Sequence, residues 1–256
     1  GSGLVGSEMC RRDRYNYNPL PAELTPEEQA YIIGVQANIW GEYIQTPEYF
    51  EYMAFPRLLA MSEVQWTQPE HKDFESFARR LDKEFERLDY CGVNACRNFY
   101  EVNQAGAWNK SQQTYEVTLN TFCPDADIYY AVNDSTVNTS SSLYETPIPL
   151  DEDATIYSAV YRSGKPLGKV TRKSFAVNKA TGCDYTCNPK AGWEHLNKGF
   201  GLTDGRRGYA RDMRRWISFY QDTVQIVVEL KKPQKVKEVA FSSLWRPVNE
   251  IWPARA

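Results

Sequence analysis

The stretch that decides the fold lies near the N-terminus, where residues 33 to 44 read IGVQANIWGEYI. The run from Val35 to Trp40 is mostly apolar and has no helical period, which is typical of a buried parallel strand. Before it, a capping box at residues 25–28 with Pro26 at the first helical position predicts a short helix that ends near Gly34. The run therefore predicts one strand of a larger α/β barrel, since a single strand cannot close a barrel.

Three helical segments are predicted after this strand. Thr46 and Pro47 begin the first, and Pro56 opens a second that runs to about Trp66, because proline is poorly tolerated inside a helix. The third is the clearest, with Gly92 as its C-terminal cap. Its apolar residues recur at intervals of three and four and form one stripe: Phe74, Phe77, Leu81, Phe85 and Leu88.

Beyond residue 100 the pattern changes to strands. Turn residues separate four β-rich segments, which predict a small β-sandwich over residues 101–180. A third region, residues 181–256, is rich in tryptophan but has only two strand-like runs, so it is interpreted as an incomplete domain. The six predicted strands are Thr114–Asn120, Asp127–Val132, Thr155–Arg162, Val170–Val177, Thr223–Leu230 and Lys235–Phe241.

Composition excludes several classes of function. The 256 residues carry a net charge of −3 with both signs interspersed, so a nucleic-acid partner is not expected. No apolar stretch is long enough to span a membrane, and Gly1–Glu8 lacks the apolar core of a signal peptide. Aromatic residues reach 14%, which suits a sugar-binding face as well as an ordinary core.

The metal-ligating residues are too few and too scattered for a metal site. None of the six cysteines forms a C-x-x-C pair, and His71 and His195 are the only histidines, so neither a metal nor a cofactor is predicted. Asp204 and Gly205 could contribute to a calcium loop, but two residues do not define a site. Cys183 and Cys187 leave two interpretations open, a local disulfide or free thiols.

Residues 33–44, followed by YMAFPRLLAMSEVQWT at residues 52–67, resemble the last strand and last helix of the barrel in glycoside hydrolase family twenty. Tyr17–Pro21 and Leu88–Asn94 also fit that family. The resemblance implies that residues 1–100 are the C-terminal piece of a (β/α)8 catalytic barrel.

Residues from about 104 to 178 resemble the small sandwich that follows the barrel in many bacterial members, through Ile128–Ser135 and Asn178–Gly182. The last region resembles the opening of a discoidin-like jelly roll, through Leu202–Gly208 and Ile251–Pro253. The resemblance therefore implies a mixed fold, in which a barrel fragment is followed by a β-sandwich and a truncated β jelly roll.

Members of this family are β-N-acetylhexosaminidases, which remove terminal β-linked N-acetylglucosamine or N-acetylgalactosamine with retention. The substrate's own acetamido oxygen is the nucleophile. An Asp on the fourth barrel strand orients the acetamide, and the adjacent Glu is the general acid/base. Asp151-Glu152 is followed by Asp153 in a polar stretch and is interpreted as a solvated turn. We therefore predict no catalytic residue in this chain and no hydrolysis by it alone.

The resemblance assigns substrate binding to two residues at the end of the predicted strand. It implies that Trp40 forms an aromatic wall of the −1 subsite and that Glu42 accepts hydrogen bonds from hydroxyls of the terminal sugar. The alternatives are a tryptophan that caps the barrel core and a glutamate favoured at a helix start by the macrodipole. Tyr43 flanks the pocket and could be either a substrate contact or a structural residue, whereas Arg57, Glu63 and Trp66 are expected to form an ion pair and packing contacts on the outer helix.

The expected partners are glycans that contain N-acetylhexosamine, and the expected location is extracytoplasmic. A second hypothesis is a non-catalytic carbohydrate-binding or scaffold fragment, which the aromatic content and the discoidin-like opening would suit. The run Gln36–Glu42 favours the first hypothesis, because a pure binding module has no use for a barrel strand.

Overall fold

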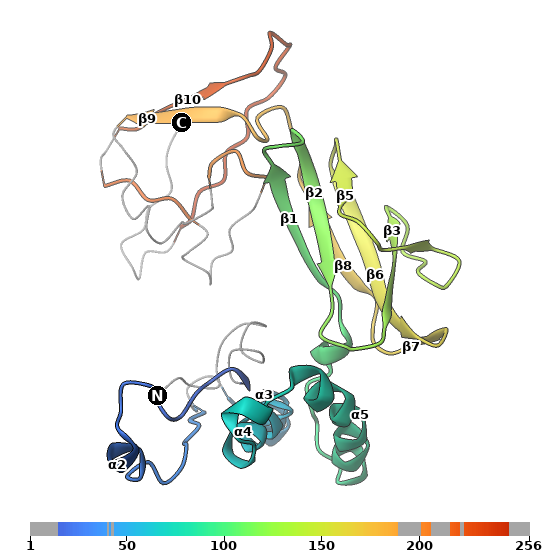
Figure 1. The fold of residues 1–256 in the computed structure, drawn as a ribbon. Coiled ribbons are helices and arrows are strands. Elements are labelled where there is room, and N and C mark those ends of the chain that lie inside the picture. The colour runs from blue at the N-terminus through green and yellow to red at the C-terminus, as the bar shows by residue number, and fades with distance from the viewer. Residues whose placement is uncertain are drawn as a thin grey trace. The chain divides into compact units, whose positions relative to one another are not determined.

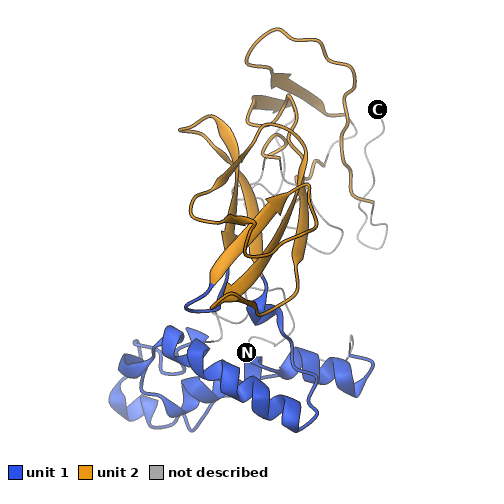
Figure 2. Ribbon diagram, turned by 90° about the vertical axis from the view of Figure 1, so that its right-hand side faces the viewer, with its two compact units in different colours: residues 1–101, 121–126 blue, residues 102–120, 127–256 orange. Residues whose placement is uncertain are grey.

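The computed structural model describes residues 15–39, 41, 44–188, 201–205, 216–220 and 223–245. The chain divides into two compact units (Figure 2). The first, here the helical unit, comprises residues 1–101 and 121–126, and the second comprises residues 102–120 and 127–256. Within the described ranges, no helix is long and apolar enough to cross a membrane.

Helices dominate the described part of the first unit (Figure 1). The capping box at its start is confirmed, because the Thr25 hydroxyl accepts from the Glu28 amide at 3.3 Å and the Glu28 carboxylate accepts from the Thr25 amide at 2.8 Å. This first helix ends at Gln29, so the expected end near Gly34 is wrong. The α-helices are α2 (Pro26–Gln29), α3 (Pro47–Ala54), α4 (Arg57–Trp66) and α5 (Phe74–Tyr90), and the 3-10 helices are Pro69–His71 and Asn98–Tyr100.

The apolar stripe predicted for the third helix is the buried face of α5. Its C-terminal end is closed by Gly92, which has a φ of 70° in the left-handed region that favours glycine. The Gly92 amide donates to the Asp89 carbonyl at 3.0 Å, and the Val93 amide donates to the Leu88 carbonyl at 2.9 Å, which together form a Schellman motif. The buried residues of α5 are Phe77, Ala78, Leu81 and Phe85.

The strand predicted from Val35 to Trp40 is wrong for the residues that the structure describes. Residues 35–39 form no strand, and none of them is fully buried. The Val35 carbonyl instead accepts a hydrogen bond from the Gln65 side chain at 3.3 Å. A parallel strand needs neighbouring strands to pair its amides and carbonyls, and the described part of the helical unit contains none.

The second unit contains the expected β-sandwich-like domain, built from two antiparallel sheets. One sheet has the order β1-β2-β5, and the other has the order β4-β3-β6-β7 with β8 also paired to β6 (Figure 1). The four strands predicted between residues 114 and 177 are confirmed, with small shifts at their ends. The strands are β1 (Asn103–Asn109), β2 (Thr114–Asn120), β3 (Asp127–Val132), β4 (Ser142–Leu143), β5 (Ile148–Leu150), β6 (Ala154–Arg162), β7 (Lys165–Pro166) and β8 (Thr171–Phe175).

Strand β1 was not predicted, because its sequence NQAGAWN has no β-branched residue. Its Gly106 lies so close to Tyr115 that a Cβ would come within 2.2 Å of the phenol oxygen. The buried Gln104 links the two sheets, since its side-chain amide donates to the Ser158 hydroxyl at 2.8 Å and to the Thr171 carbonyl at 3.1 Å. The small residue and the buried amide make β1 part of the sandwich despite its weak strand propensity.

In the third region, β9 (Asp184–Asn188) pairs antiparallel with β10 (Gln225–Glu229), which lies inside the predicted run from Thr223 to Leu230. The strand predicted at Lys235–Phe241 is wrong, because these residues are exposed and pair with no strand in the described ranges. No disulfide joins Cys183 to Cys187.

Candidate functional site

The candidate site is the loop that leads from residue 39 into α3. Trp40, Glu42 and the neighbouring Tyr43 lie outside the described residues, so their places in the site stay predictions. Between them, Gly41 is exposed, and its carbonyl accepts from the Ile44 amide at 3.1 Å.

The start of α3 determines where the loop ends. Thr46 is the N-cap, and its hydroxyl accepts from the Tyr49 amide at 3.2 Å, with Pro47 in the first turn. The helix dipole acts on charges within the first turn, where Glu48 stands. Glu42 precedes the N-cap and thus stands outside the first turn of α3 in the sequence, and its role stays a prediction.

Arg57 holds the other end of α3. Its side chain is 7% exposed and donates through one terminal nitrogen to the Met53 carbonyl at 2.7 Å and to the Tyr52 carbonyl at 3.1 Å. These carbonyls belong to the last turn of α3, where a cation is favoured by the helix dipole. Arg57 is therefore a structural residue that joins α3 to α4.

Glu63 and Trp66 were also expected to be structural residues, and the structure supports this role for Glu63 but not for Trp66. The Glu63 carboxylate accepts two hydrogen bonds from Arg80 of α5, at 2.6 and 3.0 Å, so its ion pair links α4 to α5. Trp66 is 89% exposed, so the packing role expected for it is wrong within this structure.

Burial raises the pKa of Tyr15, and two further tyrosines of the helical unit also have raised pKa values. Hydrogen bonding to Cys96 and burial raise the pKa of Tyr52 to about 12, and its hydroxyl also donates to the Asn98 side chain at 3.2 Å. Burial, followed by the hydrogen bond and charge of Asp82, raises the pKa of Tyr100, whose hydroxyl donates to that carboxylate at 2.6 Å. Both phenols stay protonated at neutral pH, which indicates a structural role.

The other acidic candidates form no site. Asp151 and Glu152 are exposed between β5 and β6, and the neighbouring Asp153 accepts from the Val177 amide at 2.8 Å. Asp204 accepts from the Gly201 amide at 3.0 Å, which closes a turn. In the part of the chain that the structure describes, no three His, Cys, Asp or Glu side chains gather in a way that could hold a metal ion.

One structurally important segment was missed by the sequence interpretation. Residues 121–126 read TFCPDA and join β2 to β3, yet they belong to the helical unit. The signal was present in the sequence, because Phe122 and Cys123 are apolar where a connection between strands usually has polar turn residues.

Family models match two separate segments of the chain. Residues 6–69 match the catalytic domain of glycosyl hydrolase family 20, and residues 103–172 match the chitobiase/beta-hexosaminidase C-terminal domain. The first match includes the candidate loop, and the second covers most of the sandwich. The discoidin-like resemblance of the last region stays a prediction.

Curated relatives agree with these matches. A beta-hexosaminidase of Porphyromonas gingivalis is 51% identical over 90 residues, which are 35% of this chain and 12% of that protein. A beta-N-acetylhexosaminidase of Cellulomonas fimi is 36% identical over 72 residues (27% and 14%), and the mouse beta-hexosaminidase subunit alpha is 30% identical over 79 residues (31% and 13%). The matched stretch thus spans only 12 to 14% of each relative. This chain is therefore similar, over residues 6–69, to part of the glycosyl hydrolase family 20 catalytic domain and, over residues 103–172, to the chitobiase/beta-hexosaminidase C-terminal domain.

Proposed function

We propose that the full-length protein is an exo-acting β-N-acetylhexosaminidase, which hydrolyses terminal β-linked N-acetylglucosamine or N-acetylgalactosamine with substrate-assisted retention. The observation that carries this proposal is the match of residues 6–69 to the family 20 catalytic domain. The identity of 51% to the Porphyromonas gingivalis beta-hexosaminidase supports it.

In this reaction the acetamido oxygen of the substrate attacks the anomeric carbon and forms an oxazoline, so the protein supplies no nucleophile. An Asp holds the acetamide, and the adjacent Glu protonates the leaving oxygen and later activates water. Neither member of this pair is assigned to the present chain, and Asp151-Glu152 does not replace it, because both residues are exposed in a turn. The chain contributes to binding the terminal sugar.

Trp40 and Glu42 are the residues that we assign to binding. The Trp40 ring forms part of the wall against the sugar, and the Glu42 carboxylate accepts hydrogen bonds from hydroxyls at its non-reducing end. A glycan extended at that end would collide with Glu42, which accounts for exo action. The place of Glu42 before the N-cap of α3 supports this assignment, because the helix dipole does not account for the residue.

The remaining assignments belong to the same proposal. The protein acts on glycans outside the cytoplasm. Its chain divides into a barrel piece at residues 1–100, a sandwich at 101–180 and the opening of a discoidin-like jelly roll at 181–256. The sandwich resemblance rests on the domain match to residues 103–172, and the jelly roll rests on sequence resemblance alone.

Hydrolysis of a chromogenic β-N-acetylglucosaminide tests the proposal directly. The full-length protein is expected to turn the substrate over, whereas the purified chain of 256 residues is expected to be inactive, because it lacks the acid pair. Turnover by the purified chain would show that catalytic residues lie within it. An inactive full-length protein that retains N-acetylhexosamine glycans would favour the non-catalytic binding hypothesis.

Glu42→Gln in the full-length protein tests the assigned binding residue. We expect kcat/KM to fall by about tenfold to a hundredfold, since a hydrogen bond to a charged group contributes about 1.5–3 kcal/mol. The matched control is Glu48→Gln, which removes the same charge from the exposed first turn of α3. Equal kinetics for the two variants would exclude Glu42 from the pocket.

A further inference from the structure

The connection between β2 and β3, residues 121–126, belongs to the helical unit, although both strands that it joins belong to the other unit. The chain leaves the helical unit after residue 101, returns to it at residue 121 and leaves again after residue 126 (Figure 2). We call residues 121–126 the β2–β3 loop. Its contacts show what it contributes to the helices.

Apolar contacts place the β2–β3 loop in the core of the helical unit. The Phe122 ring lies edge-on to Phe74 of α5, with ring centroids 6.2 Å apart and an angle of 75° between the planes. The next residue, Cys123, is 4% exposed. Phe122 also lines a cavity of about 10 Å³, room for at most one water molecule, together with Pro56, Arg57, Ala60, Phe74, Phe77, Leu81 and Phe99.

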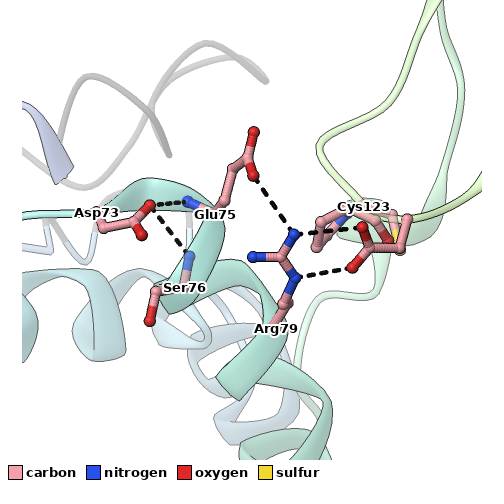
Figure 3. Close-up of polar contacts among 7 residues, drawn as sticks. Asp73, Glu75, Ser76, Arg79 and Cys123 are labelled. Atoms are coloured by element: carbon pink, nitrogen blue, oxygen red, sulfur yellow. Dashed lines mark hydrogen bonds and ion pairs between the residues drawn. The ribbon is translucent and has the colours of Figure 1, made fainter.

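A bidentate ion pair fixes the orientation of the loop. Arg79 of α5 donates from Nε to one Asp125 carboxylate oxygen at 2.7 Å and from a terminal nitrogen to the other at 3.2 Å (Figure 3). Glu75, one turn earlier, adds a weaker contact to Arg79 at 3.4 Å. Both partners of the main pair are largely exposed, so the pair specifies geometry more than it adds stability.

A short series of contacts links the β2–β3 loop to the candidate site. Phe122 and Arg57 line the same small cavity, and Arg57 donates to the last carbonyls of α3. The opposite end of α3 is capped by Thr46, where the loop that carries Trp40 and Glu42 ends. Arg57 thus connects α3 to the small cavity that Phe122 of the β2–β3 loop also lines.

We propose that Phe122 and Asp125 are positioning residues for the sugar-binding loop. Phe122 completes the core beside α4 and α5 and keeps the Arg57 contacts to α3 in place, while Asp125 holds the loop in register on α5. The catalytic part of this inference rests on the proposed hexosaminidase function. The structural part does not.

The test uses Phe122→Ala, the milder Phe122→Leu and Asp125→Asn in the full-length protein, with Leu143→Ala and Asp134→Asn as controls. Leu143 is 44% exposed on β4, and the Asp134 carboxylate accepts a local hydrogen bond from the Thr136 amide at 2.9 Å. Amide hydrogen exchange of α3, α4 and α5 is compared with that of β6, and KM and kcat are measured on the chromogenic substrate.

Phe122→Ala is expected to speed exchange in the three helices at least about tenfold while β6 is unaffected, and to raise KM several-fold with a smaller change in kcat. Phe122→Leu should restore most of both properties, Asp125→Asn should raise KM mildly, and the controls should behave as wild type.

Unchanged exchange in Phe122→Ala would overturn the place of the loop in the helical core. Faster exchange with an unchanged KM would overturn the positioning role. A wild-type protein without turnover would refute the proposed function, and the exchange measurement would still decide the role of the loop.

Discussion

At the scale of single residues, the helical unit depends on polar groups that are buried with a partner. Tyr100 is 8% exposed, and its hydroxyl donates to the Asp82 carboxylate, so it packs as an aromatic ring and pairs as a polar group. Arg57 is the one buried charged side chain in the described ranges, and it is compensated by the last carbonyls of α3. Such groups stabilise the fold only while their protonation states match their partners.

The raised pKa of Tyr100 predicts a loss of stability in alkali. Below about pH 10 the phenol is protonated in both the folded and the unfolded chain, so it adds no pH dependence. Above that pH the unfolded chain loses the proton first, because the folded pKa is raised, and the free energy of unfolding falls by at most about 1.4 kcal/mol per pH unit for each such group. Tyr52 adds to this fall up to about pH 12.

Urea denaturation between about pH 8 and pH 11, followed by a probe in the helical unit, measures this slope. Tyr100→Phe should reduce the slope, although it removes a hydrogen bond to a carboxylate that contributes about 1.5–3 kcal/mol near neutral pH. Tyr90→Phe is the control, because that ring is 93% exposed. The same alkaline slope in wild type and Tyr100→Phe would contradict the assignment.

At the scale of elements, short-range sequence patterns predicted the helices, because contacts within a few residues determine where a helix begins and which face it buries. The capping box, the prolines at helix starts and the stripe of α5 gave helices at the expected places. The strand predicted at Val35–Trp40 failed, because a parallel strand depends on partners distant in sequence. Strand β1 was missed because the places of Gly106 and Gln104 also depend on non-local contacts, with residues that the fold brings to them.

Gly92 and Gly182 have similar φ angles but different surroundings. Comparing their alanine variants therefore distinguishes the energetic cost of a strained backbone from the cost of a steric clash. Gly92 ends α5 with a φ of 70° and open space around its missing Cβ, so Gly92→Ala should cost about 1 kcal/mol. Gly182 has a φ of 73°, and its Cβ would lie 2.1 Å from the Trp108 ring, so Gly182→Ala should cost about 3 kcal/mol or more. Thermal and urea unfolding of both variants measure the difference. A similar small cost for both would mean that Trp108 moves aside.

At the scale of the whole molecule, the two family matches fall in different units. The catalytic-domain match at residues 6–69 lies in the helical unit, and the C-terminal-domain match at 103–172 lies in the other unit except for the β2–β3 loop. Of the candidate site, the sequence predicts only the two binding residues Trp40 and Glu42. Both assignments follow from the family resemblance and not from periodicity. The catalytic pair that the family resemblance implies would belong to another barrel strand, which no local pattern in this chain can supply.

The described surface of the helical unit predicts self-association of the 256-residue chain. Ile33 is 99% exposed and Trp66 is 89% exposed. The hydrogen bond from the Gln65 side chain to the Val35 carbonyl joins the two segments that carry these side chains, so we expect Ile33 and Trp66 to act together as one apolar surface. Covering both side chains would contribute about 1.5–3 kcal/mol each, so Ile33→Ser with Trp66→Ser should weaken association by about a hundredfold or more.

Sedimentation velocity over a wide range of protein concentration measures this change. Tyr90→Ser is the matched control, because that exposed ring stands among the charged residues Lys83, Glu86 and Arg87 and should contribute little. A chain that stays monomeric at every concentration, or an equal effect of Tyr90→Ser, would show that this apolar surface is not an interface.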